Sequence, residues 1–340
     1  MTILKTDTVS GIGTEGTVFE GDITFDSLNY MTLPKGTTAQ RGRGRGLYGG
    51  GSSDPSTNNT DIVYLNVQSS GNTIQFGDLT VTNRTWIHGV GSATRAIWPG
   101  GSNSAGPAKT NVIDYVTITT TGNATDFGDT LTTGSWTASH SNNTRGITAG
   151  GAPNNTNVMG YITITTTGNM TDFGDMTTGR RGAGRMGSTT RFIMTGGLTA
   201  PADAYTNIMD YVTIATTGNA TDFGDSVAAA RHDSGGCSSG TRGIVAGGQT
   251  PSATNAIQYV TIASTGNASD FGDLTVAQTI SGALDNSIRG VFAGSYQPAQ
   301  LNVVSYVEIV TTGNGKDFGD ISPSKYAMGG TSDSHGGLSE

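Results

Sequence analysis

The sequence contains very little cysteine and little charge, and each shortage excludes a class of protein. Its 340 residues include one cysteine, Cys237, so neither an internal disulfide nor a cysteine-rich metal site is expected. Charged residues make up only 13% of the chain, and the net charge is −8. Phosphate binding needs concentrated lysine and arginine, so nucleic acid is excluded as a main partner. The one basic run, residues 41–45, is too short to change this conclusion.

Long apolar stretches are missing as well. No stretch is long enough to span a bilayer, and the first residues lack the apolar core of a signal peptide. We therefore expect no membrane insertion, and synthesis in a cytoplasm. Proline is scarce, at 9 residues, whereas glycine is abundant, at 53, without the Gly-X-Y period of collagen. Short apolar runs that recur between glycine-rich and threonine-rich segments predict an all-β protein with many tight turns.

One sequence unit recurs six times along the chain. From Tyr115, its second half reads Tyr-Val-Thr-Ile-Thr-Thr-Thr-Gly-Asn-Ala-Thr-Asp-Phe-Gly-Asp. The phenylalanine of this half marks each copy: Phe76, Phe127, Phe173, Phe223, Phe271 and Phe318. Successive phenylalanines are 51, 46, 50, 48 and 47 residues apart, a spacing that suits one four-stranded propeller blade.

The first half of the unit ends in a diglycine and reads Thr-Arg-Gly-Ile-Val-Ala-Gly-Gly at residues 241–248. The Ile-Val-Ala and Tyr-Val-Thr-Ile runs are β-branched with apolar residues on both faces, which predicts strands covered on both sides by neighbouring blades. The diglycine ends a strand where the backbone bends, and Thr-Gly-Asn supplies a turn between two antiparallel strands. Each unit therefore predicts one antiparallel blade.

A diglycine after an apolar strand, then an aromatic strand, then a second aromatic about twelve residues later resembles the kelch repeat. The resemblance covers about residues 41–330; it departs from the kelch pattern where Phe in Asp-Phe-Gly-Asp replaces the usual outer-strand Trp. Kelch domains are β-propellers, so the resemblance implies a six-bladed β-propeller of four-stranded, kelch-like blades.

The two ends of the repeat region predict how the ring closes. No complete inner strand precedes the first diglycine, Gly50-Gly51, whereas residues 324–330 match residues 230–236 in spacing. We therefore expect the carboxy-terminal strand to complete the first blade, so that no sheet edge is left bare. The predicted organisation is a short amino-terminal β arm, residues 1–40, followed by the propeller, residues 41–340.

Two charged positions recur in all six units. The arginines are Arg45, Arg95, Arg145, Arg191, Arg242 and Arg289. The aspartates are Asp78, Asp129, Asp175, Asp225, Asp273 and Asp320. The pattern favours a structural interpretation, in which Arg and Asp pair within or between blades and Asp caps turns, because framework positions repeat unchanged. Two alternatives stay open: a ring of cations that binds an anionic sugar, and aspartate pairs that bind Ca²⁺.

No arrangement of residues predicts catalysis. The four histidines, His88, His140, His232 and His335, fall in different units without the spacing of a metal site, and Asp-Phe-Gly lacks the other kinase motifs. We therefore predict a non-enzymatic protein with no cofactor and no metal site.

The connections after each diglycine differ in length and content, and they lie on the face opposite the near-identical Thr-Gly-Asn turns. Unlike loops on a constant framework are typical of a recognition surface. The residues predicted to bind there are Trp98, Asn103, Asn154, Asn155, Tyr205 and Tyr296. Trp86 and Trp136 fall in inner-strand segments and are interpreted as packing residues.

The amino-acid sequence of the repeat resembles repeats in structural proteins of tailed phages that infect marine bacteria, cyanophages among them. The segments Val9-Ser-Gly-Ile-Gly-Thr-Glu-Gly and Ser332-Asp-Ser-His-Gly-Gly-Leu are similar to the ends of such proteins. The resemblance implies a virion structural protein, assembled in the host cytoplasm and localised to the virion: a tail fibre, a tail tip or a head decoration.

Two functions follow from this resemblance. In the first, residues 1–40 attach to other virion proteins and the variable loops bind a host glycan or receptor. In the second, the chain is an architectural head or tail decoration that contacts only virion proteins. The oligomeric state stays open; phage fibres are commonly trimeric, and the arm offers a contact for a homotrimer.

Overall fold

The computed structural model describes residues 44–53, 60–103, 108–226, 231–280 and 282–338, all within the unit Arg43–Glu340. The expected arm, residues 1–40, lies outside the described residues. The described chain consists of β-strands and turns with one short 3-10 helix, η2 (Gly336–Leu338). The predicted all-β class is therefore confirmed.

Most strands belong to six four-stranded antiparallel sheets, numbered here 1 to 6 in chain order. The innermost strands are β31 (Tyr326–Ser332), β5 (Val90–Gly91), β10 (Ala138–Ser141), β15 (Gly184–Gly187), β21 (Gly235–Ser238) and β27 (Gly282–Asp285). The second strands are β1 (Arg45–Ser52), β6 (Arg95–Pro99), β11 (Arg145–Ala149), β16 (Arg191–Thr195), β22 (Arg242–Ala246) and β28 (Arg289–Ser295). The third strands are β2 (Asp61–Asn66), β8 (Val112–Thr117), β12 (Val158–Thr163), β19 (Ile208–Thr213), β25 (Ala256–Thr261) and β29 (Leu301–Glu308). The outermost strands are β3 (Ile74–Asp78), β9 (Thr125–Asp129), β13 (Thr171–Asp175), β20 (Thr221–Asp225), β26 (Ser269–Asp273) and β30 (Lys316–Asp320).

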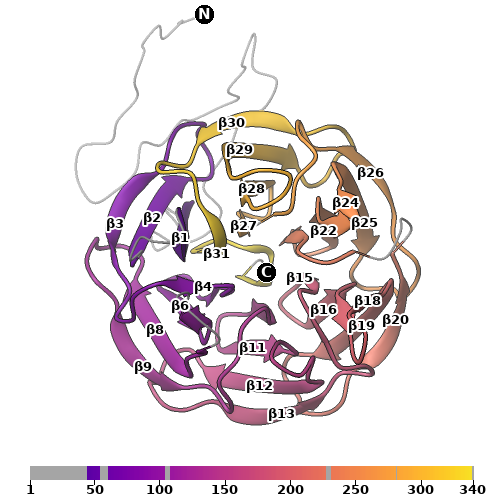
Figure 1. Cartoon of the computed structure of the whole chain (residues 1–340), viewed down its shortest axis with the longest axis horizontal. Coiled ribbons are helices and arrows are strands. Elements are labelled where there is room, and N and C mark those ends of the chain that lie inside the picture. The colour runs from indigo at the N-terminus through magenta and orange to yellow at the C-terminus, as the bar shows by residue number, and fades with distance from the viewer. Residues whose placement is uncertain (1–43, 54–59, 104–107, 227–230, 281, 339–340) are drawn as a thin grey trace, which may run out of the picture. The chain divides into compact units, whose positions relative to one another are not determined.

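The sheets stand around a common axis in a propeller-like arrangement (Figure 1). Connections alternate between the two ends of the antiparallel strands. The Thr-Gly-Asn turns between third and outermost strands lie at one end, the turn face. The post-diglycine loops and the links between sheets lie at the other end, the loop face. The sequence predicted this division.

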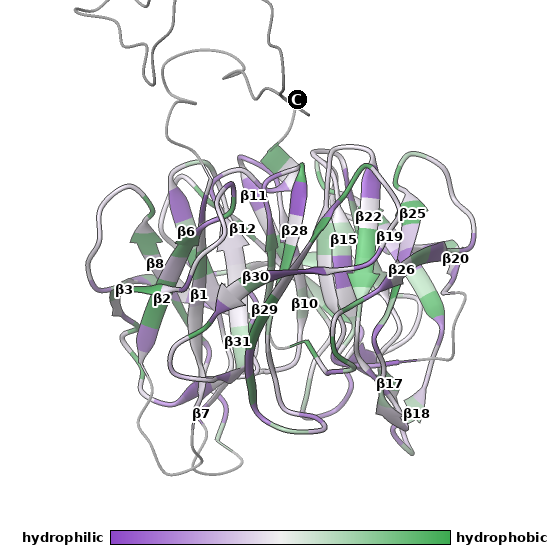
Figure 2. Cartoon of the chain, turned by 90° about the horizontal axis from the view of Figure 1, so that it is seen from above, coloured by the Kyte–Doolittle hydropathy of each residue, from purple (hydrophilic) through white to green (hydrophobic). Residues whose placement is uncertain are grey.

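Short strands decorate the loop face, and Figure 2 places three of them, β7, β17 and β18, at its lower edge. The full set is β4 (Arg84–Thr85), β7 (Ser102–Asn103), β14 (Arg180–Arg181), β17 (Leu198–Thr199), β18 (Ala204–Tyr205), β23 (Gln249–Thr250) and β24 (Ser252–Ala253).

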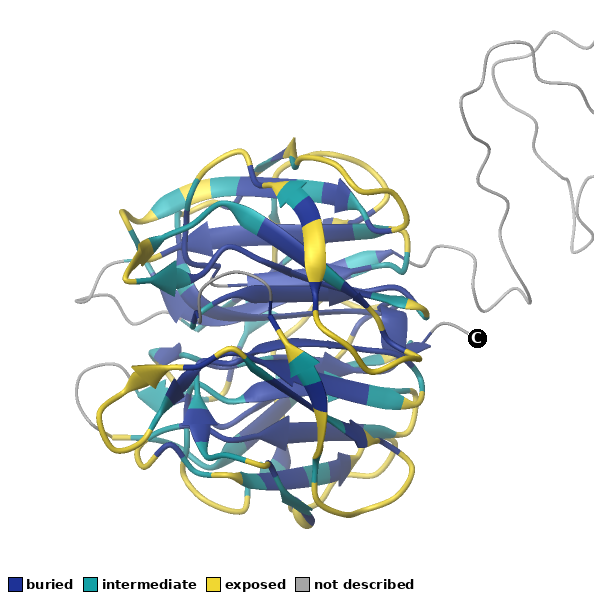
Figure 3. Cartoon of the chain, turned by 90° about the vertical axis from the view of Figure 1, so that its right-hand side faces the viewer, coloured by how far each residue is buried: buried dark blue, intermediate teal, exposed yellow. Residues whose placement is uncertain are grey.

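The core lies between neighbouring sheets. The second strands are buried on both faces, which explains their β-branched, apolar sequences. One cluster joins Ile147 and Phe173 of sheet 3 to Phe192 and Met194 of sheet 4. Figure 3 shows the result: buried residues concentrate in the strands, and exposed residues concentrate in the connections at the two faces.

Sheet 1 combines the two ends of the described chain. β31 pairs antiparallel with β1, in a register that places Gly46 opposite Ser332 and Gly50 opposite Met328. The sequence predicted this pairing from the spacing of residues 324–330, because β1 otherwise lacks an inner neighbour.

Each Thr-Gly-Asn turn docks on the outermost strand of the preceding sheet. Gly168 donates its N–H to the carbonyl of Phe127 at 2.8 Å, and the Asn169 Oδ1 accepts the N–H of Asp129. The glycine of Phe-Gly-Asp makes this approach possible, since a Cβ at Gly174 would overlap the carbonyl of Gly218. Sheet 1 makes the same contact with sheet 6, where Gly71 donates to Phe318.

Candidate functional site

The recurring arginines clamp neighbouring sheets. Each guanidinium lies over the tyrosine of its own sheet, 4.3 Å from the ring centroid for Arg145 and Tyr161. The same guanidinium donates to a carbonyl of the next sheet, as Arg145 does to Ile214 at 2.8 Å. All six arginines follow this pattern, and Arg289 of sheet 6 donates to Gln68 of sheet 1.

The predicted pairing of these arginines with the recurring aspartates is wrong. Arg145 stands opposite Thr163 at the turn-face end of β12, whereas Asp175 stands opposite Val158 at the loop-face end. Five strand steps separate the two positions by roughly 17 Å, which is too far for an ion pair. The aspartates instead receive local hydrogen bonds, such as the one from the Thr60 hydroxyl to Asp78.

Trp98 was predicted to lie on the binding surface, and this is wrong. The side chain is 0% exposed, and its Nε1 donates to the Gly329 carbonyl at 2.9 Å. The ring fills the space beside Gly49, where a Cβ would come within 2.6 Å of it. The glycine of the neighbouring sheet therefore makes Trp98 a core residue.

The other predicted binding residues occupy the loop face in different states. Tyr205 and Tyr296 are 39% and 48% exposed, and Asn154 is also exposed. Asn103 is half-buried in β7. Asn155 is buried, and its amide donates to Asp203 at 3.0 Å while its oxygen accepts from Arg181, so it organises a loop.

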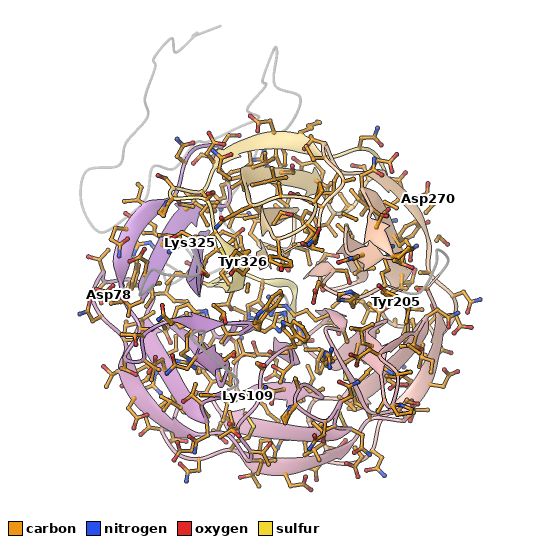
Figure 4. The ribbon with its side chains drawn as sticks, viewed as in Figure 1. Asp78, Lys109, Tyr205, Asp270, Lys325 and Tyr326 are labelled. Carbon is orange, nitrogen blue, oxygen red and sulfur yellow. The ribbon has the colours of Figure 1, made fainter. Side chains whose placement is uncertain are left out.

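Four aromatic side chains, each from a different sheet, meet near the axis on the loop face, and we call them the axial aromatic cluster: Trp86, Trp136, Tyr296 and Tyr326. Trp86 and Trp136 pack edge to face, with ring centroids 4.6 Å apart. Tyr296 and Tyr326 lie 5.1 Å apart, and each also contacts Trp86. Figure 4 labels Tyr326 close to the axis and Tyr205 further out. Both tryptophans and Tyr326 stay partly exposed.

The two tryptophans sit in a strained backbone. Their φ angles are 54° for Trp86 and 58° for Trp136, a region that bulky residues rarely occupy. Head-to-tail hydrogen bonds hold them there: Trp86 donates to Ala327, and Trp136 donates to Trp86. The series continues through Gly182, Asp233 and Ile280, each donating to the residue before it. Gly182, Asp233 and Ala327, at the same position in other sheets, also have φ angles between 54° and 65°, so the repeat itself imposes this conformation.

Polar groups flank the cluster. The Arg181 guanidinium lies 4.7 Å from the Trp136 ring and forms a salt bridge to Asp203 at 2.8 Å. The hydrogen bond from Asn155, reinforced by Arg181, lowers the pKa of Asp203, which therefore stays ionised. Further along, the Tyr205 ring lies 5.5 Å from His232.

The packing role predicted for Trp86 and Trp136 is incomplete, because both also contribute to this surface. One sequence signal pointed to them. Their repeat position holds Gly182, Asp233, Ile280 and Ala327 in the other sheets, so two tryptophans there depart from the framework.

Titratable side chains that are far apart in the sequence lie close together at the common axis of the sheets. Arg185 of β15 donates to carbonyls of three other segments, including Ala283 at 3.0 Å and Gly330 at 2.7 Å. His140, His335 and Asp285 line the same small space, a cavity of about 30 Å³. Burial lowers the pKa of His140 to about 3 and of His335 to about 4, and it raises the pKa of Asp285 to about 7.

The last described residues cover the turn-face end of this space. The Asp285 carboxylate accepts the N–H groups of Ser238 at 2.8 Å and Gly336 at 2.7 Å, which ties η2 to β21 and β27. The axis is therefore filled by polar side chains at its middle and covered by η2 at one end.

Neither a metal centre nor a membrane span is visible in the described part of the chain. Within the described ranges, no three His, Cys, Asp or Glu residues lie close enough to hold a metal ion. No helix among the described residues is both long and apolar enough to cross a membrane.

These features define a class: a repeat protein of four-stranded antiparallel sheets in a propeller-like arrangement, with an aromatic surface at the axis of its loop face. No protein-family model matches the chain, and no curated protein matches it significantly.

Proposed function

We propose that the six sheets are the blades of a closed, six-bladed β-propeller with kelch-like repeats. Two contacts between sheets 6 and 1 support closure: Gly71 donates to Phe318, and Arg289 donates to Gln68. Both repeat the contacts between consecutive sheets elsewhere. The pairing of β31 with β1 supports a ring without a bare edge in its first blade.

We further propose that this propeller is a non-enzymatic phage virion protein of the tail fibre or tail tip, and that its loop face binds a host-surface glycan. The observation that carries the proposal is the axial aromatic cluster, held by a strained backbone and partly exposed. Aromatic rings present a large, rigid, apolar face with little entropy to lose on binding, and sugars offer apolar C–H faces to such rings. Arg181 and Asp203 add hydrogen-bonding groups at the rim.

The position of the chain's entry supports a division of labour between the faces. Gly44 donates its N–H to Asp333, and β1 begins beside it at the turn face. The described chain therefore begins at the face opposite the glycan-binding loops, and residues 1–40, which precede it in the sequence, are proposed to attach to other virion proteins.

The test is binding of the full chain to surface polysaccharides extracted from marine bacteria, cyanobacteria included. Trp86→Ala and Tyr296→Ala are expected to weaken binding at least tenfold each, because each removes a ring from the cluster. Val310→Ala is the matched control: Val310 is 62% exposed but lies at the turn face, so binding should be unchanged.

A well-folded chain that binds none of these polysaccharides would contradict the attachment role. It would favour the architectural alternative, a head or tail decoration that contacts only virion proteins.

A further inference from the structure

One repeat position on the loop-face link holds a long polar side chain in five sheets and glycine in sheet 3. Its carbonyl lies against the first diglycine residue of the preceding sheet, which makes the six positions equivalent. They are Lys325, Arg84, Gly134, Arg180, Arg231 and Gln278 for sheets 1 to 6. A second position, on the third strand, is set by its pairing with the second strand. It holds Val63, Asp114, Gly160, Asp210, Gln258 and Ser305.

In sheets 2 and 4 these two positions form a buried ion pair. Arg84 and Asp114 approach to 2.6 Å, Arg180 and Asp210 to 3.0 Å, and all four side chains are fully buried. Arg84 also donates to the carbonyls of Gly100, Trp98 and Val112. Its side chain therefore fills the space between the link and the sheet.

Sheet 3 lacks this filling. Gly134 and Gly160 replace the arginine and the aspartate, and Thr148 stands where sheet 2 has Trp98 and sheet 4 has Met194. All three small residues line a cavity of about 310 Å³, whereas the two axial cavities measure about 20 and 30 Å³. Small-molecule sites begin at about 300 Å³.

The lining of the cavity has a definite chemistry. No charged side chain takes part, six threonines supply hydroxyl groups, and Asn154 stands at the rim. Leu131, Val158 and Met170 provide an apolar wall. The six threonines are Thr130, Thr132, Thr133, Thr137, Thr148 and Thr156.

The cavity also includes the residues whose counterparts bind the guanidinium in sheet 2. Thr148, Gly150 and Val158 correspond to Trp98, Gly100 and Val112, whose carbonyls accept from Arg84. Gly134 has no side chain to donate to them. A ligand in the cavity therefore needs hydrogen-bond donors, and because no carboxylate is present to neutralise a cation, an uncharged ligand is favoured.

We propose that this cavity, the sheet 3 pocket, binds a neutral sugar residue. Hydroxyl groups match the carbonyl and threonine groups, and a C–H face matches Leu131, Val158 and Met170. The inference rests on the proposed function, since the pocket opens beside the loops of the same face and would add a neutral sugar to the glycan bound there.

The test follows the Met170 methyl signal by nuclear magnetic resonance in the full chain with labelled methionine. Neutral methyl hexosides at millimolar concentrations are expected to shift this signal, since Met170 lines the pocket. The methyl glycoside of glucuronic acid, with its carboxylate free, serves as an anionic probe, and methylguanidine serves as a cationic probe. Both should leave the Met170 signal unchanged. A signal that responds to no neutral hexoside, or that responds instead to methylguanidine, would overturn the proposal.

Gly134→Gln blocks the pocket with a residue that sheet 6 uses at the same position, Gln278. A Cβ at Gly134 finds its nearest neighbour at 3.4 Å, so the substitution fits the backbone. The hexoside shift should be lost in this variant. Thr121→Gln, which introduces the same side chain at an exposed turn-face residue, should keep it.

The outcomes separate this inference from the proposed function. If hexosides shift the Met170 signal but the chain binds no polysaccharide, the sheet 3 pocket is supported and the attachment role is excluded. Polysaccharide binding that depends on Trp86 but is unaffected by Gly134→Gln, without any hexoside shift, would remove the pocket and leave the attachment role.

Discussion

Arg185 links several sheets at the axis, because its guanidinium donates hydrogen bonds to the carbonyls of Gly89, Ala283 and Gly330. Its equivalents in the other innermost segments are small, namely Gly89, Ser139, Gly236, Ala283 and Gly330. Because these residues leave the axis free, one guanidinium from sheet 4 can reach the carbonyls of sheets 1, 2 and 6. A planar group with five donors suits this task better than an ammonium group does.

Arg185→Met should therefore lower the free energy of unfolding by about 2–4 kcal/mol, since it leaves buried carbonyls without their charge-assisted donors. The free energy of unfolding of Arg185→Lys should lie between those of the unaltered chain and Arg185→Met, because lysine keeps the charge but lacks the planar set of five donors. Urea unfolding of the full chain measures both. An unchanged midpoint for Arg185→Met would show that the carbonyls do not depend on the guanidinium.

Single residues also mark the limit of what the sequence predicted. Trp98 follows an apolar strand and precedes a diglycine, which placed it near the rim. Its burial depends on Gly49 and Gly329 of the neighbouring sheet, and local patterns carry no information about such a contact. The recurring arginines were likewise assigned the wrong partner, because the tyrosine and the aspartate of one unit are indistinguishable as partners until strand register is known.

At the scale of elements, the repeat predicted the secondary structure better than it predicted the contacts of single residues. The strands, the diglycine bends and the Thr-Gly-Asn turns follow from local residue chemistry, and all appear at the expected places. The innermost strands were harder, because their sequences differ most between units. They and the carboxy-terminal segment gather His88, His140 and His335 in or beside the axis, a grouping that distant sequence positions conceal.

These histidines predict a dependence of stability on pH. Burial lowers the pKa of His88 and His140 to about 3 and of His335 to about 4, whereas in the unfolded chain each takes up a proton near pH 6.5. The contribution of these three histidines to the free energy of unfolding is therefore fully present above pH 6.5 and is lost as the pH falls. Burial raises the pKa of Asp285 to about 7, so between pH 4 and 7 this carboxyl is protonated in the folded chain and ionised in the unfolded chain. It therefore cancels the effect of one of the three histidine protons. The net loss from these groups is roughly 3 kcal/mol per pH unit between pH 6 and 4.

His140→Gln isolates one of these groups. The amide can donate to the Ser188 carbonyl, as the ring nitrogen does at 3.0 Å, but it takes up no proton. The slope of unfolding free energy between pH 6 and 4 should fall by about 1.4 kcal/mol per pH unit. Denaturant titrations at several pH values measure the slope, and an identical slope in the variant would exclude His140 as a contributor.

At the scale of the whole molecule, the two faces differ in kind. The turn face repeats one contact six times, with five Thr-Gly-Asn turns and the Ser70-Gly71-Asn72 turn docked on neighbouring sheets. The loop face breaks the repeat twice, with tryptophans at Trp86 and Trp136 and with the glycines of the sheet 3 pocket. Departures from a constant framework are where a repeat protein places recognition. We therefore propose that the loop face is the recognition surface.

The chain's tryptophans allow a direct test of glycan binding at the axial aromatic cluster. Of its three, Trp86 and Trp136 are partly exposed in the axial aromatic cluster, while Trp98 is fully buried. Acrylamide quenching of intrinsic fluorescence should therefore report mainly on the cluster. A polysaccharide that the full chain binds should protect the accessible fraction from acrylamide and leave the buried fraction as it was. Binding with an unchanged quenching profile would place the glycan away from the cluster and contradict a glycan-binding role for these tryptophans.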